Sequence, residues 1–414
     1  MAHHFRHGIL AALAVLALSA VTAKARAEAT SDAAPDGDRY KIHIITIGPG
    51  DDLFSRFGHI GVVVDDREQR TRRVYNFGTF DFSDPDLRVR YARGFLTYWL
   101  SVSSYRGLLR AYEEDDRDVA LRTLALPPGA AADVARRLEI NARPENREYQ
   151  YRHYLDNCCT RIRDIIDEAT HGAISRATKR GPTGRTFRDW TRRALEGMPL
   201  YGIVILYSLG PAIDRPITRW EEEFLPEVLS EDLDTVILAD GRALVESTQI
   251  VMQRRGPPIG SRTGSLDIAV LGVIALLLAF GLFVPLFARG RGLAGRSLGV
   301  GLTTYGLIAG LGGLMLTLYW TWTTHYDTHY NENLLLTPVT HLWILGPGLK
   351  LLFKGDLGAR TARFLELYLV VAMLAVLAVI VLKLGPFIQG NWGVVAFAAL
   401  ADAALYTALR RRRR

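Results

Sequence analysis

The sequence predicts an α+β domain followed by an all-α bundle of about five transmembrane helices. Two observations predict this fold class. The first two thirds of the chain is charged and contains short β-branched runs between helical patterns, and the remainder is a series of apolar segments joined by short polar loops. The predicted parts are a signal peptide at 1–27, an exported domain at 28–264 and a transmembrane domain at 265–414.

A secretory signal peptide is expected at the N-terminus. The basic start is followed by an apolar stretch at 8–21 and then by the small-x-small sequence at 25–27. The apolar stretch is too short for a comfortable membrane span. Lys24 and Arg26 are unusual at a cleavage region and leave an uncleaved anchor as an alternative. Either form places the following domain outside the inner membrane of a bacterial cell.

The exported domain begins with a predicted three-stranded meander. The segment 41–47 alternates as a strand and ends at a Gly-Pro-Gly turn, and a polar, helical turn is predicted at 51–57. A β-branched strand follows at 58–64, with His59 at its entrance, and a return strand is predicted at 73–78.

Further elements follow in order. The segment 90–112 is predicted as an amphipathic helix, or as a helix and then a strand. A strand is predicted at 119–126 and a helix at 127–141, opened by Pro-Pro-Gly. The segment 158–170 has helical spacing, and Asn157 is a good N-cap residue for it.

The second part of the chain contains five segments that are apolar enough to span a membrane, each near the ~20 residues required. They are 268–288, 298–322, 334–353, 364–382 and 387–409. The third contains Pro338, His341 and Pro347 and is the least regular as a straight helix.

The distribution of basic residues predicts the orientation of these spans. Basic residues occur in the first loop, around the third loop and in the C-terminal tail. The first loop has Arg289, Arg291 and Arg296, and the third loop and its edges have Lys350, Lys354, Arg360 and Arg363. The tail is the arginine run at 410–414. The second loop has no lysine or arginine, and the fourth has only Lys383 at its edge. The positive-inside rule therefore predicts a cytoplasmic C-terminus in the inner membrane and an exported domain on the periplasmic side.

The second loop, on the side of the exported domain, reads His325-Tyr-Asp327-Thr-His329-Tyr-Asn331. Polar and aromatic residues are common at membrane interfaces, and His-x-Asp-x-His is only a weak metal-binding pattern. We expect an interfacial or substrate-contact role for this loop and predict no metal site.

The only two cysteines, Cys158 and Cys159, are adjacent and so are poorly placed for an unstrained disulfide with each other. Cys158 falls in the first turn of a predicted helix, where the helix dipole favours the thiolate. A nearby histidine would complete an activated nucleophile. His59 is the best candidate base, while His153 is an alternative whose tyrosine-rich surroundings favour packing. Asn76 or Tyr75 would orient the imidazole. The competing interpretation is that both cysteines are buried structural residues.

Several motifs resemble the Lnb N-terminal periplasmic domain family. They are Phe57-Gly-His59, Tyr75-Asn-Phe-Gly-Thr-Phe80, Asp156-Asn-Cys158 followed by Thr160-Arg161, the stretches 209–215 and 223–226, and 331–338. The resemblance extends from about residue 40 to the C-terminus. It implies a permuted papain-like domain in which Cys158 is the nucleophile and His59 the base. It also implies transfer of an acyl chain from a phospholipid to the N-terminal amine of lipoproteins, with Cys159 as a bystander.

From these considerations we predict Cys158, His59 and Asn76 as catalytic residues, without a cofactor. The residues predicted to contact substrate are Tyr75, Asn157, Arg161, His325 and Asn331. The partners expected are a phospholipid acyl donor, a lipoprotein acceptor and the lipid bilayer. Nucleic acid is not expected, because the positive net charge of +7 reflects arginines placed by membrane topology.

Two other functions remain open from the residues alone. One is a papain-like peptidase or amidase acting on cell-wall peptide, which would use the same Cys–His pair but would not need five spans. The other is a non-enzymatic envelope scaffold, which would tolerate loss of Cys158. The apolar run at 198–209 is predicted as an ordinary core segment, with a position at the membrane interface as the alternative. Asp214, Arg215 and the acidic residues at 221–223 are predicted to be structural.

Overall fold

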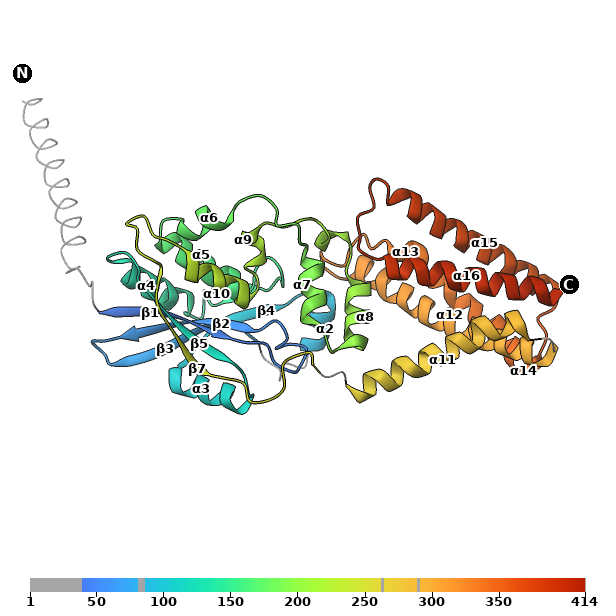
Figure 1. Cartoon of the computed structure of the whole chain (residues 1–414), viewed down its shortest axis with the longest axis horizontal. Coiled ribbons are helices and arrows are strands. Elements are labelled where there is room, and N and C mark those ends of the chain that lie inside the picture. Colours follow the sequence, from blue (N-terminus) through green and yellow to red (C-terminus); the bar gives the residue numbers. More distant parts are fainter. Residues whose placement is uncertain (1–38, 81–85, 262–263, 289–290, 414) are drawn as a thin grey trace, which may run out of the picture.

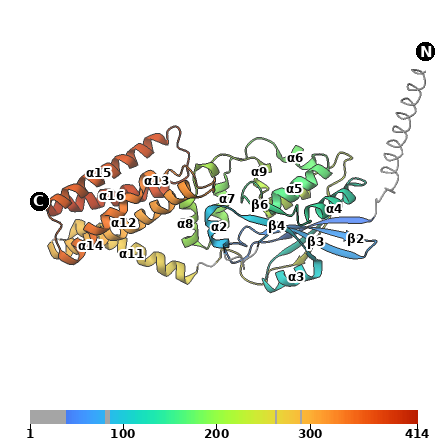
Figure 2. The same ribbon diagram turned by 180° about the vertical axis from the view of Figure 1, so that it is seen from behind.

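The computed structural model describes residues 39–80, 86–261, 264–288 and 291–413. The predicted signal peptide at 1–27 lies outside these residues. The molecule is elongated, with a mixed α/β domain at one end and a helical bundle at the other (Figures 1 and 2).

A seven-stranded antiparallel sheet organises the soluble domain within the described residues. The strands lie in the order β6-β4-β3-β2-β1-β5-β7. Their bounds are β1 Tyr40–Ile47, β2 His59–Asp66, β3 Thr71–Thr79, β4 Thr97–Ser104, β5 Val119–Leu124, β6 Glu148–Gln150 and β7 Val245–Met252. The α+β class and the strands expected at 41–47, 58–64, 73–78 and 119–126 are confirmed. The segment 51–57 forms turns and not a helix.

Helices cover both faces of this sheet. Their bounds are α2 Leu87–Arg93, α3 Tyr105–Glu114, α4 Ala130–Asn141, α5 Cys158–Ala169, α6 Ala173–Thr178, α7 Phe187–Ala194, α8 Pro199–Ser208, α9 Arg219–Glu222 and α10 Pro226–Thr235, with a 3₁₀ turn η1 at Pro211–Ile213. The helices predicted at 127–141 and 158–170 are confirmed as α4 and α5. The segment 90–112 resolves into the end of α2, strand β4 and most of α3.

The alternation of side chains along β1 divides the core into two layers. Ile44 packs into the larger layer with residues of α4, α5 and α10, whereas its neighbour Ile45 packs on the opposite face with Leu108 of α3. Successive side chains of a strand point to opposite faces, so β1, which carries isoleucines at both even and odd positions, requires cover on both sides. The larger layer is the one that fixes α5, and with it Cys158, against the sheet.

Five helical segments beyond this domain are long and apolar enough to cross a membrane. The helices are α11 Ser265–Phe287, α12 Arg291–Trp322, α13 Asn333–Leu336, η2 Val339–Ile344, α14 Leu345–Lys354, α15 Ala359–Leu382 and α16 Trp392–Arg413. The five predicted spans are confirmed. The third span is broken into α13, η2 and α14, and its first break falls at Pro338, which cannot donate a backbone hydrogen bond.

The end of α8 is tied to both halves of the molecule. The last carbonyl groups of a helix have no partner within it and must be satisfied from outside. Here the guanidinium of Arg188 donates to the carbonyl oxygens of Leu206 and Leu209, at 2.7 and 2.8 Å. Asn331, from the outer loop of the bundle, donates to the carbonyls of Tyr207 and Ser208, both at 3.0 Å. The soluble domain and the bundle therefore share the capping of one helix.

Two buried ion pairs reinforce this junction. Arg188 pairs with Asp214 at 2.7 Å, and their side chains are 2% and 6% exposed. Lys383 pairs with Glu332 at 2.8 Å, and their side chains are 4% and 3% exposed. Asp214 is thus structural, as predicted. The apolar run at 198–209 does not form an ordinary core segment, because α8 exposes Tyr201, Ile203 and Val204.

Candidate active site

The N-terminus of α5 positions Cys158. Asn157 is the N-cap residue, and its Oδ1 accepts from the backbone N–H groups of Cys159 and Thr160 at 2.9 and 3.0 Å. The hydroxyl of Thr160 accepts in return from the N–H of Asn157 at 2.9 Å, which completes a capping box. This reciprocal cap fixes the first turn of the helix and holds Cys158 at its positive end.

The two adjacent cysteines occupy different environments. Cys158 is half-buried, whereas Cys159 is fully buried at 0% exposure in the larger core layer. Their sulfur atoms lie 4.0 Å apart, at the outer limit for a sulfur hydrogen bond. A donor thiol from Cys159, together with His59, lowers the pKa of Cys158 well below its usual range, while burial raises that of Cys159. Only Cys158 combines a reachable sulfur with thiolate character.

His59 lies at the start of β2 and joins Cys158 to Asn76. One ring nitrogen, Nε2, is hydrogen-bonded to Oδ1 of Asn76 on the neighbouring strand β3. The imidazole is also hydrogen-bonded to Cys158, which leaves Nδ1 as the nitrogen on the thiol side. Burial lowers the pKa of His59, but the charge of the Cys158 thiolate and the two hydrogen bonds outweigh it and raise that pKa. Both shifts in pKa favour an imidazolium–thiolate pair over a neutral imidazole and thiol.

Gly78 closes the site from the side of β3. The pairing of β3 with β4 is irregular between Asn76 and Thr79, and Gly78 lies within this bulge with a φ of +97°. A Cβ at this position would lie 3.7 Å from Cε1 of His59 and 3.9 Å from Cβ of Cys158. The bulge thus directs Asn76 toward the imidazole and brings backbone without a side chain against Cys158 and His59.

Most backbone N–H groups at the start of α5 are already hydrogen-bonded, which limits the groups that could stabilise an oxyanion. The N–H groups of Cys159 and Thr160 are engaged by Asn157, and that of Arg161 donates to the carbonyl of Asn157 at 3.2 Å. Within the described residues, the N–H of Cys158 itself is the group at this helix start for which no acceptor is recorded. An oxyanion formed on Cys158 would lie beside this donor.

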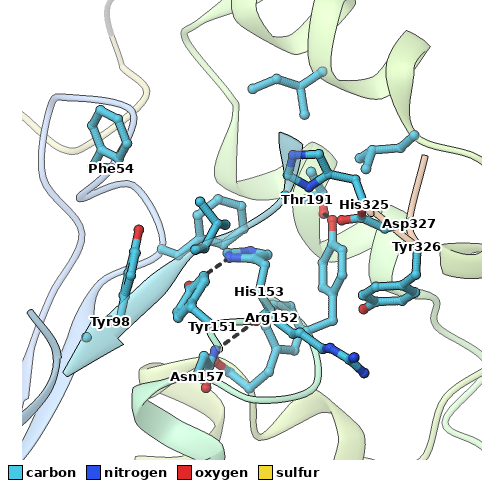
Figure 3. Close-up of a pocket in the computed structure, with 18 of the residues that line it drawn as sticks. Phe54, Tyr98, Tyr151, Arg152, His153, Asn157, Thr191, His325, Tyr326 and Asp327 are labelled. Carbon is cyan, nitrogen blue, oxygen red and sulfur yellow. Dashed lines mark hydrogen bonds between the residues drawn. The ribbon is translucent and has the colours of Figure 1, made fainter. Parts of the chain in front are cut away.

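A cavity of about 570 Å³ opens beside the pair. Cys158, His59 and Gly78 contribute to its wall. Aromatic side chains from the soluble domain form one side, among them Phe54, Tyr98 and Tyr151, and His325, Tyr326 and Asp327 from the outer loop of the bundle form the other (Figure 3). We call this space the thiol cavity. Its wall belongs to both halves of the molecule.

His153, the alternative base, is committed to packing. Its ring lies between aromatic neighbours, with a centroid separation of 4.3 Å from Phe57, and its Nδ1 is hydrogen-bonded to the hydroxyl of Tyr151 at 3.1 Å (Figure 3). Burial lowers the pKa of His153 to about 4, so the ring is neutral near pH 7. The geometry favours His59 as the partner of Cys158.

The predicted substrate-contact residues divide into two groups. Asn157 and His325 line the thiol cavity. Tyr75 is fully buried with its hydroxyl on Glu139, Arg161 pairs with Asp156 at 2.7 Å, and Asn331 donates to the end of α8. The positions of Tyr75, Arg161 and Asn331 lend no support to a direct role in substrate binding.

In the described part of the chain, no group of His, Cys, Asp and Glu side chains is arranged to hold a metal ion.

Sequence reasoning did not single out the aromatic wall of the cavity. Phe54 lies in the turns after β1, Tyr98 in β4 and Tyr151 after β6, and no spacing in the sequence connects them. Stacking brings two of them together, since the rings of Tyr98 and Tyr151 are 4.4 Å apart. Asp327 also lines the cavity, and the His-x-Asp-x-His pattern was the one available signal for it.

Comparison with known families adds to this geometry. Residues 27–195 match the Lnb N-terminal periplasmic domain. The match contains Cys158, His59 and Asn76 and ends just after α7, so the resemblance expected for the later stretches lies outside it. No curated protein and no solved structure matches the chain. With its five spans, the chain is a membrane protein with an Lnb N-terminal periplasmic domain.

Proposed function

We propose that this protein is a cysteine-dependent acyltransferase that moves an acyl chain from a phospholipid to the N-terminal amine of lipoproteins. One observation carries the proposal: Cys158 and His59, whose imidazole is hydrogen-bonded to Asn76, line a cavity whose opposite wall is the outer loop of the membrane bundle. A thiolate placed beside a membrane surface is suited to attack lipid esters. The relation to permuted papain-like enzymes, implied by the sequence resemblance, belongs to this proposal.

The first half-reaction forms a thioester. The Cys158 thiolate attacks the ester carbonyl carbon of the phospholipid, and the resulting oxyanion is stabilised by the N–H of Cys158. The C–O bond to glycerol then breaks, and the imidazolium of His59 donates its proton to the departing alkoxide. The products are a lysophospholipid and acyl-Cys158, and His59 is left neutral.

The second half-reaction transfers the acyl chain to nitrogen. The neutral α-amine of a diacylglyceryl-cysteine attacks the thioester carbonyl carbon, and His59 removes a proton from the amine. The C–S bond breaks and the Cys158 thiolate leaves as the amide forms. Both half-reactions use the same imidazole, first as acid and then as base, and Asn76 keeps its ring in one orientation throughout.

The experiment that tests the proposal measures the N-terminal acylation of lipoproteins by mass spectrometry. The host cells lack any other N-acyltransferase and express wild type, Cys158→Ala or Cys159→Ala at matched levels. The triacylated form should appear with wild type and be lost with Cys158→Ala. Cys159→Ala should retain most of it, because Cys159 is buried and only assists the thiolate.

A uniform acylation pattern in all three strains would overturn the proposal. A papain-like amidase acting on cell-wall peptide would then be tested by incubating the purified protein with that peptide and comparing wild type with Cys158→Ala. Two observations favour a lipid substrate over a cell-wall peptide. One wall of the thiol cavity is formed by a loop of the membrane bundle, and the chain has five spans where a peptidase would need one anchor at most.

The proposal includes the orientation of the bundle. With a periplasmic domain before five spans, the C-terminus lies in the cytoplasm of the inner membrane, in agreement with its basic tail. Alkaline phosphatase fused after the last span should be inactive, whereas a fluorescent protein fused there should be bright.

A further inference from the structure

A second cavity lies on the other side of α8. It has a volume of about 1030 Å³ and is walled by α8, α11, α12 and α16. Apolar side chains such as Leu200, Val204, Leu271, Leu278, Met315 and Phe397 line it. We call it the apolar groove. Figures 1 and 2 show α8 at the junction, beside the ends of α11 and α12 that meet the soluble domain.

The groove begins at the outer ends of the membrane spans and reaches about half-way along them. Its deepest residues on the two longest walls are Leu278 of α11 and Ile308 of α12. At a rise of about 1.5 Å per residue, they lie about 18 Å from Leu266 and about 21 Å from Trp322, the outer ends of these spans. Half of a hydrocarbon core of about 30 Å is about 15 Å. The groove therefore extends from the outer ends of the spans to about the midplane of the bilayer or a few ångströms beyond it, which is long enough for one acyl chain of an outer-leaflet lipid.

Polar groups of the groove gather at its outer end. Arg192 and Glu196 lie on or just after α7, and Asn391 lies immediately before α16. Asn391 is 6% exposed, and its Oδ1 has no hydrogen-bond donor among the described residues. An unpaired acceptor at the outer end of an apolar groove fits a ligand that has a polar, hydrogen-bonding head and an apolar tail.

The groove and the thiol cavity are separated by a single helix. Ile205, Ser208 and Leu209 of the α8 region line the thiol cavity, while Ile203, Val204 and Tyr207 line the groove. Leu195, between α7 and α8, lines both. A helix with its side chains is about 10 Å across. An ester at the outer end of the groove would therefore lie about one helix diameter from the thiol cavity.

We propose that the apolar groove binds an acyl chain of an outer-leaflet phospholipid and that this bound lipid is the acyl donor. Its identity as the donor rests on the proposed function, whereas its binding does not. Because the acyl chain is already out of water in the bilayer, its retention in the groove depends on packing against the groove wall and on the polar groups at the outer end. The polar outer end keeps the glycerol ester at the level of α8, next to the cavity that contains Cys158.

Gly393 offers a substitution that fills the groove without disturbing the fold. It lies on the groove wall in α16, and a Cβ built on it meets no atom within 4 Å. Gly346 of α14 has equally open surroundings and does not line the groove. Both glycines lie in membrane helices, so Gly393→Phe and Gly346→Phe gain similar helix propensity. They differ in the space that the new ring occupies.

The test uses the full-length protein in vesicles of phosphatidylethanolamine and phosphatidylglycerol that contain a phosphatidylethanolamine with a photoreactive group on one acyl chain. After illumination, mass spectrometry locates the cross-linked peptides. Wild type and Gly346→Phe should be labelled on α8, α11 and α12, and Gly393→Phe should show a severalfold loss of this labelling. Equal labelling of the two variants, or labels spread evenly over all lipid-facing helices, would overturn the proposal and indicate annular lipid only.

The cross-linking experiment is independent of catalysis. Cys158→Ala should lose acyl transfer but keep the labelling of the groove. If groove labelling follows the expected pattern while wild type transfers no acyl chain to lipoproteins, the lipid site stands and the proposed function fails. If wild type and Gly393→Phe transfer acyl chains at the same rate although the variant has lost its labelling, the bound lipid is not the donor.

Discussion

The two sides of α8 face cavities of opposite character. The thiol cavity is lined by titratable groups and stacked aromatic rings, and the shifted pKa values of Cys158 and His59 in its wall favour their charged forms. The apolar groove is walled by aliphatic side chains and has polar groups only at its outer end. The same ten-residue helix, Pro199–Ser208, supplies side chains to both.

This difference shows how a predominantly apolar helix is placed at a membrane surface. A helix that is apolar on all sides is normally buried in a core or a membrane. In α8 only Gly202 and Ser208 are buried, and two faces of the helix line the thiol cavity and the apolar groove. Its carbonyl end is capped by charged and amide side chains from both halves, so the helix serves as a fixed wall. Four substitutions test this comparison.

The largest expected effect concerns the reactive side. The pKa of the Cys158 thiol is lowered, so Cys158 remains a thiolate as the pH falls, until the pH passes that lowered pKa. The pKa of His59 is raised, so the imidazole keeps its second proton to a higher pH than a free histidine. Alkylation of Cys158 by iodoacetamide, located by mass spectrometry in a protein that keeps the fully buried Cys159, should be nearly independent of pH between about 6 and 8. His59→Ala should slow it about 10- to 100-fold at about pH 6.5 and reduce acyl transfer about 1000-fold.

His153→Ala is the matched control for this measurement. Its ring is neutral and packed among aromatic side chains, so the pH dependence of alkylation should keep its wild-type form. If His153→Ala altered the pH dependence of alkylation and His59→Ala did not, His153 would be the partner of Cys158 and His59 the packing residue.

The next effect concerns the wall between the cavities. Arg188→Met leaves Asp214 buried without its partner and removes the cap of α8. Loss of one member of a buried pair destabilises by about 3–5 kcal/mol. Arg192→Met removes a pair whose side chains are 55% and 46% exposed, and its effect should stay within about 1 kcal/mol. Thermal unfolding in detergent compares them, and similar shifts for the two variants would refute the role of the buried cap.

A smaller effect is expected for the residue that orients the base. Asn76→Ala removes the hydrogen bond to Nε2 of His59. Hydrogen bonds to charged groups are worth about 1.5–3 kcal/mol, so kcat for acyl transfer should fall about 10- to 100-fold with little change in KM. Asn76→Asp keeps an acceptor and should restore part of the rate. An unchanged kcat in Asn76→Ala would remove Asn76 from the site.

The smallest effect concerns the groove side. The hydroxyl of Tyr207 is hydrogen-bonded to Oγ1 of Thr337 at 2.6 Å, across the groove from α8 to the third span. Hydrogen bonds between membrane helices average about 0.6 kcal/mol, so Tyr207→Phe should lower the unfolding midpoint slightly. Tyr201→Phe, at an exposed position of the same helix, should leave the midpoint unchanged. Equal midpoints for the two variants would show that this contact contributes nothing measurable.

Local signals in the sequence were sufficient for much of the fold. The alternation of β1 to β3, the N-cap at Asn157 and the five apolar spans each follow from patterns within about 25 residues. The order of His59 before Cys158, with Asn76 on the next strand, was enough to predict that these three residues lie together, and their catalytic role stays a prediction. The structure brings these three residues together because β2 and β3 are paired and α5 packs against them.

Contacts between distant segments could not be predicted in this way. Strand β7 pairs with β5, although more than a hundred residues separate Val245 from Leu124. Asn331 reads as a polar loop residue, yet it is 5% exposed and caps a helix from the other half of the chain. The apolar run of α8 has no periodicity that distinguishes a core from a groove, so its position depends on neighbours that the local sequence does not reveal.

The buried pair of Glu332 and Lys383 also bears on how the chain is inserted into the membrane. Lys383 is the one basic residue at the fourth, outer loop, and a positive charge there opposes the usual bias of topology. Its ammonium is neutralised by Glu332, which lies 51 residues earlier in the chain, immediately before the third span. The described residues of these two loops therefore present no unpaired lysine. The orientation that we propose from the arginine-rich ends of the spans is then not opposed by a free positive charge on the other side of the membrane.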